Sequence, residues 1–162
     1  MAEKFNIPID ISPHDGRFED GRHYFACRVY FEDTDFSGIV YHANYLRYME
    51  RARSDMLRQL NMDQNAAYDG GEGVYAVADM AIKYILPAKL DNDLIVISTV
   101  EKLRAASVII EQMVVRSNPD SSIDKIASAT VQAAFLSPTG RPRRQPQAWT
   151  KAFASVMTPR TE

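Results

Sequence analysis

The chain has 162 residues, of which 46% are hydrophobic and 25% are charged, and its formal net charge at pH 7 is −2. This length fits one domain with a core of its own, and the composition is that of an ordinary globular protein. The balanced charge and the lack of a long basic run argue against a nucleic-acid partner, and no apolar run is long enough for a transmembrane segment.

The start of the chain and its cysteine content bear on the compartment. The first residues are polar and acidic, without the charged-then-apolar pattern of a signal peptide. A single cysteine, Cys27, rules out an internal disulfide. We therefore expect a cytoplasmic protein.

Residues 1–22 are rich in proline, glycine and charge and show no periodicity, so we expect a flexible N-terminal arm. Residues 24–31 then alternate in hydrophobicity, which predicts a half-buried strand that ends at Phe31. A turn at residues 36–38 follows this strand.

Between residues 43 and 60, apolar side chains recur at intervals of three and four, which predicts an amphipathic helix with Asn44 as its N-cap. Such a helix would be about 27 Å long. Its apolar stripe consists of large side chains, so we expect the helix to lie against a sheet.

Four strand-like runs follow, joined by short connections that favour hairpins and an antiparallel meander. The order of strand, long helix and four strands indicates an α+β fold, with an antiparallel five-stranded sheet wrapped around a long central helix. A short terminal helix is expected at residues 149–156. The four runs are residues 74–86, 94–103, 107–116 and 124–136.

The connection between the first strand and the helix carries candidate chemistry. It places a carboxylate, Asp35, and an imidazole, His42, beside the amino end of the helix. Free backbone N–H groups at such an end can hold a developing oxyanion. A carboxylate facing such a helix end suits the hydrolysis of an activated acyl group.

Residues 33–53, with the sequence DTDFSGIVYHANYLRYMERAR, resemble the active-site signature of the 4-hydroxybenzoyl-CoA thioesterase family. The Tyr-His at 41–42 and the Glu-Arg-Ala-Arg at 50–53 are most similar to its Tol-Pal-associated branch, the YbgC type. The resemblance implies a hotdog domain at residues 23–147. Beyond it, we expect residues 148–162 to form a C-terminal helix and tail. The resemblance also implies a homodimer or a tetramer with active sites at the subunit interface.

The resemblance further implies an acyl-CoA thioesterase that releases a free acid and CoA. No cofactor is implied, since coenzyme A enters only as part of the substrate. The catalytic aspartate of the family falls on Asp35, as general base or nucleophile, and the histidine of the branch falls on His42, whose backbone N–H is the expected oxyanion donor. The branch often has Tyr where this chain has Phe31, so a hydroxyl that could orient Asp35 or water is missing.

These residues also have structural interpretations. Asp33 and Asp35 before a glycine are ordinary turn residues, and we expect Asp33 to bind backbone donors. The His42 side chain either serves the reaction or pairs with a carboxylate. Gly38 is expected to supply a backbone shape that a Cβ would obstruct. Other hotdog thioesterases use a helical Glu as base or nucleophile, but for Glu50 we favour an ion pair.

The substrate-binding prediction covers two groups of residues. One surrounds the thioester at the helix start, and the other is a basic cluster that either holds the CoA phosphates or is a solvated end of the domain. The three histidines show no metal-ligand spacing, so no metal site is predicted. The predicted substrate-binding residues are Phe31, Gly38, Tyr41, Arg141, Arg143 and Arg144.

Other functions on the same fold stay open. A non-catalytic sensor of acyl-CoA or acyl carrier protein would need no acid at the thioester, and a hotdog dehydratase would need a different pairing of histidine and acid. Acyl carrier protein is also a possible partner of the enzyme. The sequence leaves the acyl group undetermined.

Overall fold

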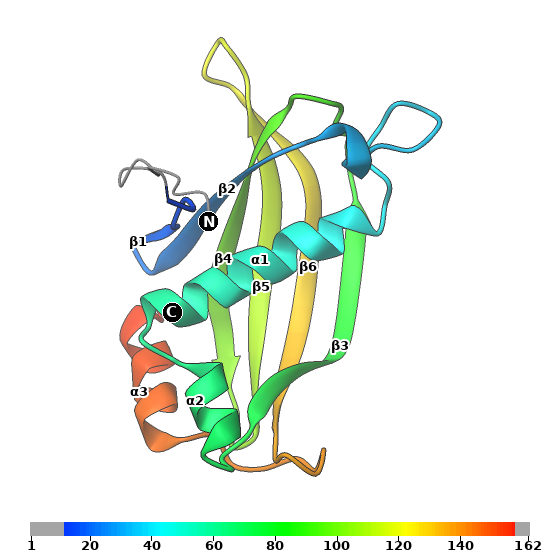
Figure 1. The fold of residues 1–162 in the computed structure, drawn as a ribbon. Coiled ribbons are helices and arrows are strands. Elements are labelled where there is room, and N and C mark those ends of the chain that lie inside the picture. The colour runs from blue at the N-terminus through cyan, green and yellow to red at the C-terminus, as the bar shows by residue number, and fades with distance from the viewer. Residues whose placement is uncertain (1–11, 158–162) are drawn as a thin grey trace, which may run out of the picture.

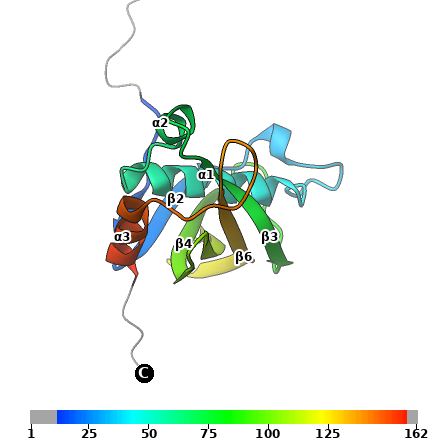
Figure 2. The same cartoon turned by 90° about the horizontal axis from the view of Figure 1, so that it is seen from below.

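One long helix, α1 (Asn44–Gln59), lies across an antiparallel sheet that curves around it (Figure 1). The computed structural model describes residues 12–157. Viewed from one end, the sheet curves beneath α1 (Figure 2). The strands are β1 (Arg17–Glu19), β2 (Arg22–Arg28), β3 (Val74–Tyr84), β4 (Asp93–Leu103), β5 (Ser107–Ser117) and β6 (Ile123–Leu136).

The sheet has six strands in the order β1-β2-β4-β5-β6-β3. The expected hairpins β4–β5 and β5–β6 are confirmed. The expected hairpin across residues 87–93 is wrong, because β3 pairs with β6 and β4 pairs with β2. Strand β3 therefore lies at the edge of the sheet beside β6. The connection at residues 87–93 carries the chain across the sheet to β4, which lies next to β2. The α+β class predicted from the order of elements holds, with one strand more than expected.

Helix α1 is fixed by its apolar face. Tyr48, Met49, Ala52 and Met56 are completely buried against the sheet. Full burial of a side chain as large as Met49 or Met56 contributes about 1.5–3 kcal/mol. The predicted helix of residues 43–60 is thus confirmed within one residue at each end.

The end of the molecule at the C-terminus of α1 has a second hydrophobic cluster. There α3 (Gln147–Val156) buries Phe153 against Met56 and the strands. A short helix, α2 (Gln64–Asp69), which sequence reasoning missed, is capped by Asp63, whose side chain accepts a hydrogen bond from the Ala66 N–H. None of the helices in the described part of the chain is long and apolar enough to cross a membrane.

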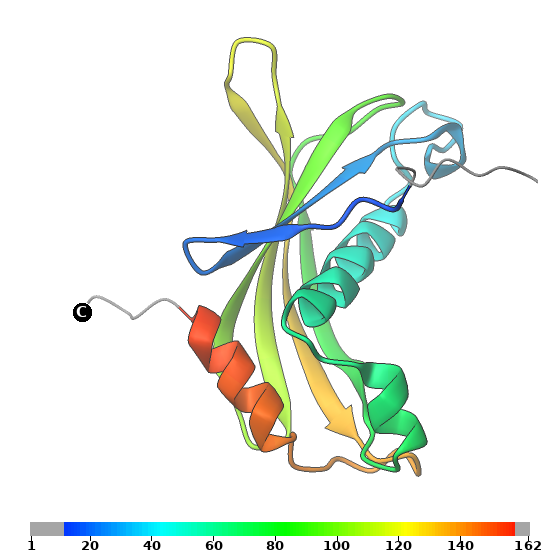
Figure 3. The same ribbon diagram turned by 60° about the vertical axis from the view of Figure 1, so that its left-hand side comes forward.

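The expected flexible arm is ordered over its second half. Strands β1 and β2 form a hairpin within and just beyond residues 1–22 (Figure 3), while residues 1–11 lie outside the described residues. The buried Asp55 carboxylate on α1 accepts hydrogen bonds from the Gly16 N–H at 2.9 Å and from His23 Nε2 at 2.7 Å. A Cβ on Gly16 would lie within 2.6 Å of both side chains. The expectation of a loose segment was therefore wrong for this part.

The His23–Asp55 pair makes stability depend on pH. Burial of the His23 ring lowers its pKa from 6.5, and the hydrogen bond and charge of Asp55 oppose that shift only in part. His23 therefore binds a proton near pH 6.5 in the unfolded chain, but only at a lower pH in the folded chain. This contribution to stability is complete above pH 6.5 and falls, by up to about 1.4 kcal/mol per pH unit, as the pH drops below it.

We expect His23→Gln to flatten the dependence of the unfolding free energy on pH between about 7.5 and 5.5. Urea titrations at several pH values measure this. His14→Gln is the matched control, because His14 is exposed. Equal slopes for the wild type and His23→Gln would contradict the assignment.

Candidate active site

The loop between β2 and α1 is closed around Asp33. Its backbone carbonyl accepts hydrogen bonds from the Tyr41 N–H and from Asn44 Nδ2, both at 2.9 Å. Its carboxylate accepts a hydrogen bond from the Tyr30 N–H at 2.8 Å. Asp33 is buried, so the structural role expected for it is confirmed. Both ends of the loop are therefore hydrogen-bonded to Asp33.

Asp35 lies in the projecting part of this loop and is exposed. Its Oδ1 accepts hydrogen bonds from the Ser37 N–H at 2.8 Å and from Ser37 Oγ at 2.5 Å. These two bonds, with a smaller contribution from the charge of His42, lower the pKa of Asp35. Asp35 is thus held ionised, and its second oxygen has no hydrogen-bond partner in residues 12–157.

Gly38 serves the loop in a different way from the one expected. A Cβ built on it would meet no atom within 4 Å, so no obstruction arises in the single chain. Its φ of +79° is the reason for glycine, since L side chains avoid this region. The Gly38 N–H donates to the Asp35 carbonyl at 3.0 Å and closes the turn.

The amino end of α1 is free of a side-chain cap. The N-cap is Ala43, and Asn44, the expected N-cap, is instead the first helical residue and donates its amide to Asp33. Within residues 12–157, no group accepts a hydrogen bond from the backbone N–H of His42 or Ala43. Uncapped N–H groups at a helix start carry partial positive charge and bind anionic oxygens.

Two aromatic rings hold the His42 imidazole at this helix start. The Tyr41 ring lies 4.4 Å away between centroids, and the Tyr84 ring from β3 lies edge-on at 6.2 Å. The Tyr84 hydroxyl also donates to the His42 carbonyl at 3.1 Å. His42 and Tyr41 are thus brought together with the Asp35 loop, as the sequence predicted. Within residues 12–157, no carboxylate forms a hydrogen bond with the imidazole.

Phe31 lies elsewhere than expected. Strand β2 ends at Arg28, and Phe31 begins a short 3-10 helix, η1 (Phe31–Asp33). Its side chain is 82% exposed, and that of Tyr30 is also exposed. The expected strand at residues 24–31 was therefore wrong over its last three residues. The strand stops early because Asp33 bonds the Tyr30 backbone.

Glu50 takes the ion-pair alternative. Its Oε2 accepts from Arg53 Nη2 at 2.6 Å, and its Oε1 accepts from Ser54 Oγ at 2.9 Å. Arg53 is buried and also donates to Gln112 Oε1 at 2.7 Å. Gln112 in turn donates to the Met49 carbonyl at 3.0 Å, so the buried charge is hydrogen-bonded on both sides.

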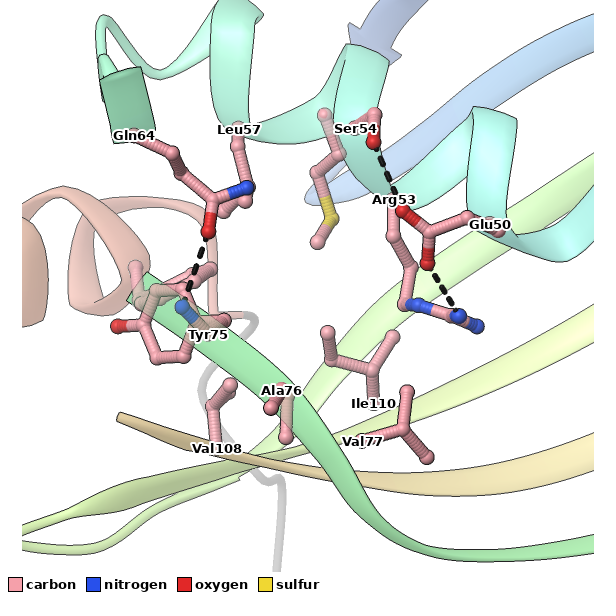
Figure 4. A pocket seen from close by; sticks show the side chains of 13 residues that line it. Glu50, Arg53, Ser54, Leu57, Gln64, Tyr75, Ala76, Val77, Val108 and Ile110 are labelled. Atoms are coloured by element: carbon pink, nitrogen blue, oxygen red, sulfur yellow. Dashed lines mark hydrogen bonds and ion pairs between the residues drawn. The ribbon is translucent and has the colours of Figure 1, made fainter. Parts of the chain in front are cut away.

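Glu50 and Arg53 border two neighbouring hollows between α1 and β3. The inner one, of about 80 Å³, is drawn in Figure 4 and is floored by apolar side chains of β3 and β5. The outer one is an open groove of about 530 Å³ lined by Leu46, Met80 and neighbouring residues. Both include Val77, and neither includes Asp35 or His42. The groove begins one helical turn beyond the site.

The predicted arginine cluster does not meet the Asp35 site within one chain. Arg143 donates to the carbonyls of Gly71 and Glu72 at 2.8 and 3.0 Å, next to the start of β3. The site lies at the other end of that strand, beside Tyr84. Arg141 and Arg144 belong to the same segment, and the orange connection between β6 and α3 lies at the lower end of the molecule in Figure 1.

Other reactive groups have structural explanations. Cys27 packs against the main core cluster, and burial raises the pKa of its thiol to about 12. Such a thiol is a poor nucleophile at neutral pH. Among residues 12–157, no three His, Cys, Asp or Glu side chains gather as ligands for a metal ion.

Comparison with known proteins agrees with this geometry. The model of the thioesterase superfamily matches residues 37–123. The acyl-CoA thioesterase YbgC of Haemophilus influenzae is 37% identical over 119 residues, which cover 74% of this chain and 88% of that protein. The chain belongs to the thioesterase superfamily. The family resemblance drawn from residues 33–53 is thereby confirmed.

Solved structures give the same family and fold. A probable thioesterase from Bartonella henselae is 34% identical, with a TM-score of 0.70, and the match covers 77% of this chain and 99% of that one. The 4-hydroxybenzoyl-CoA thioesterase of Pseudomonas sp. strain CBS-3 is 20% identical, with a TM-score of 0.73 over 81% of this chain and 98% of that one. The hotdog fold is confirmed for this thioesterase.

The Ser37 contacts give a direct test of the site electrostatics. We expect Ser37→Ala to raise the pKa of Asp35, because the bond from the hydroxyl favours the ionised carboxylate. NMR titration of the Asp35 side chain measures this. Ser122→Ala is the matched control, since Ser122 makes the same two bonds to Asp120 in a distant turn. An unchanged Asp35 pKa in Ser37→Ala would show that the hydroxyl does not hold the carboxylate in solution.

Proposed function

We propose that this thioester hydrolase acts on acyl-CoA, with Asp35 as general base or nucleophile and the start of α1 as the oxyanion site. The observation that carries the proposal is the position of an ionised, water-exposed carboxylate in the same short loop as uncapped backbone N–H groups. The acyl-CoA thioesterase named above supports the choice of substrate.

The charge state of Asp35 limits its role. A carboxylate whose pKa is lowered is ionised at neutral pH, so it can deprotonate water or attack the thioester carbonyl but cannot donate a proton. The CoA thiolate is a good leaving group and needs little protonation. We therefore assign Asp35 the central step and give His42 a secondary role in orienting the substrate.

The helix start stabilises the charge that develops during the reaction. When a nucleophile adds to the thioester carbonyl, its oxygen becomes anionic, and the free His42 N–H is placed to donate to it. One such donor typically lowers the barrier by about 3–4 kcal/mol. Tyr41 and Phe31 are exposed, and we assign both to the substrate-binding surface of this loop.

The groove between α1 and β3 is our candidate for the acyl chain. It begins near Leu46, about one turn into α1, and its walls expose mostly apolar surface. The ion pair of Glu50 and Arg53 stands between the groove and the inner cavity. This polar pair would meet the far end of a medium-length acyl group and so limit its length.

We further propose that the enzyme works as a homodimer or a dimer of dimers and needs no metal or redox cofactor. We also propose that the enzyme is located in the cytoplasm. Thioesters of acyl carrier protein are an additional candidate substrate. The sensor alternative differs in one respect, since it predicts binding of acyl-CoA without release of thiol.

We expect Asp35→Asn to reduce kcat by at least about 100-fold, because the amide can neither accept a proton nor attack. His42→Ala should lose less activity. Release of free thiol from acyl-CoA measures both. The matched control is Glu32→Gln, which neutralises another exposed carboxylate of the same loop and should leave kcat within about threefold of the wild type.

The opposite ranking would refute the assignment. If His42→Ala proved inactive while Asp35→Asn kept nearly normal turnover, the base would have to lie elsewhere. Circular dichroism of each variant separates a loss of chemistry from a loss of fold.

A further inference from the structure

The inner cavity between α1 and β3 takes no part in breaking the thioester bond. It measures about 80 Å³, and its lining includes the buried side chains of Val108, Ile110 and Phe153. An empty space in an apolar core costs stability, because the atoms around it lose packing contacts. Since this cavity adjoins the groove that we assign to the acyl chain, its relation to that chain decides which acyl groups fit.

The inner cavity and the outer groove share a boundary. Glu50 and Arg53 on α1 line both hollows, and so does Val77 on β3. In Figure 4, Val77 lies across from Arg53 on the opposite wall. An acyl chain that extends from the groove into the cavity must therefore pass between these side chains.

The α1 side of the boundary is held in place by hydrogen bonds. Arg53 is buried and donates to Gln112 Oε1 at 2.7 Å and to Glu50 Oε2 at 2.6 Å. Glu50 also accepts from Ser54 Oγ at 2.9 Å. Displacing Glu50 would leave a buried guanidinium without its countercharge, which is costly. This side of the boundary is therefore a fixed polar wall.

The β3 side consists of a single apolar side chain. Val77 pairs across the strands with Ala133 of β6, which lines the cavity, and directly opposed residues share one face of a sheet. The register between β3 and β6 shifts directly after Val77. Such irregularities bend a strand and redirect its side chains. Val77 is thus the last residue of the regular pairing before the shift, and its size determines the gap to the polar wall.

We propose that Val77 is a specificity-determining residue, which closes the inner cavity against the acyl chain and so sets the longest acyl group that the enzyme hydrolyses efficiently. From His42 to Glu50, α1 advances about 12 Å along its axis, which is the length available before the boundary. Longer acyl groups meet Val77, although the cavity behind it continues to Phe153 of α3. The inference rests on the proposed function for its substrate.

Val77→Ala tests this role, because it widens the boundary without uncovering a charge. Thiol release is measured over the series from acetyl-CoA to palmitoyl-CoA. We expect the ratio of kcat/KM for longer to shorter acyl groups to rise about tenfold, which is the effect of one or two methylene groups in an apolar pocket. Ile123→Ala is the control, because Ile123 is an exposed apolar residue that lines neither hollow, and it should keep the wild-type ratio.

A second substitution shows whether the added chain length enters the inner cavity. Ala133→Leu places a larger side chain into this cavity from β6. Combined with Val77→Ala, it should return the ratio to the wild-type value, and Ala133→Val is the milder alternative if the larger side chain prevents folding. An unchanged ratio in Val77→Ala would overturn the proposal, and so would a gain that survives the filling of the cavity.

Trp149 provides a measurement that needs no turnover. It is the single tryptophan of the chain, and its ring lies 5.6 Å between centroids from the ring of Tyr75, which lines the inner cavity. Bromine quenches indole fluorescence at short range. Bromohexanol that enters the cavity should therefore lower the emission of Trp149, and we expect stronger quenching in Val77→Ala than in the wild type.

The fluorescence measurement separates a failure of this inference from a failure of the proposed function. A wild type that releases no thiol from any acyl-CoA would refute the proposed function, and the quenching then decides whether Val77 closes the cavity. Stronger quenching in Val77→Ala that Ala133→Leu abolishes would support this role. Equal quenching in the wild type and Val77→Ala would overturn it.

Discussion

The hydrogen bonds at one buried residue, Asp33, fix the geometry on which the candidate site depends. Its carboxylate holds the backbone where β2 ends, and its carbonyl holds Tyr41 and Asn44 where α1 begins. Because both ends of the loop meet here, the residues between them must turn outward in a tight excursion closed by Gly38. Asp35 is thereby presented to solvent, and α1 starts without a side-chain cap.

This arrangement separates the parts that give stability from the part that does the chemistry. Met49, Ala52 and Met56 anchor α1 in the sheet, and Asp33 ties the loop to the start of this anchored helix. The excursion at residues 34–39 has no buried side chain and can carry an exposed carboxylate. The ion pair of Glu50 with Arg53 lies between these regions and borders the groove that we assign to the acyl chain.

The sequence was most informative where one local pattern determines the structure. The apolar period of residues 43–60 located α1, and the family signature located the loop with Asp35 and His42. The order of the strands could not be predicted in this way, because the short connection at residues 87–93 does not reveal that β3 pairs with β6. The bond between His23 and Asp55 joins residues far apart in the chain, so the ordered hairpin near the N-terminus left no local signal.

The arginine cluster shows another limit of sequence reasoning. The composition of residues 141–144 suggested phosphate binding, but only the strand register shows that this segment and Tyr84 lie at opposite ends of β3.

The most direct test of the proposed acyl-CoA hydrolysis is the release of free thiol by the wild-type protein from a panel of acyl-CoA thioesters of graded chain length, with binding measured in parallel. We expect turnover, with a preference for acyl groups that end before the Glu50–Arg53 pair. Tight binding of acyl-CoA without any release of thiol would contradict it and would identify the protein as a sensor or a hydrolase of carrier-protein thioesters.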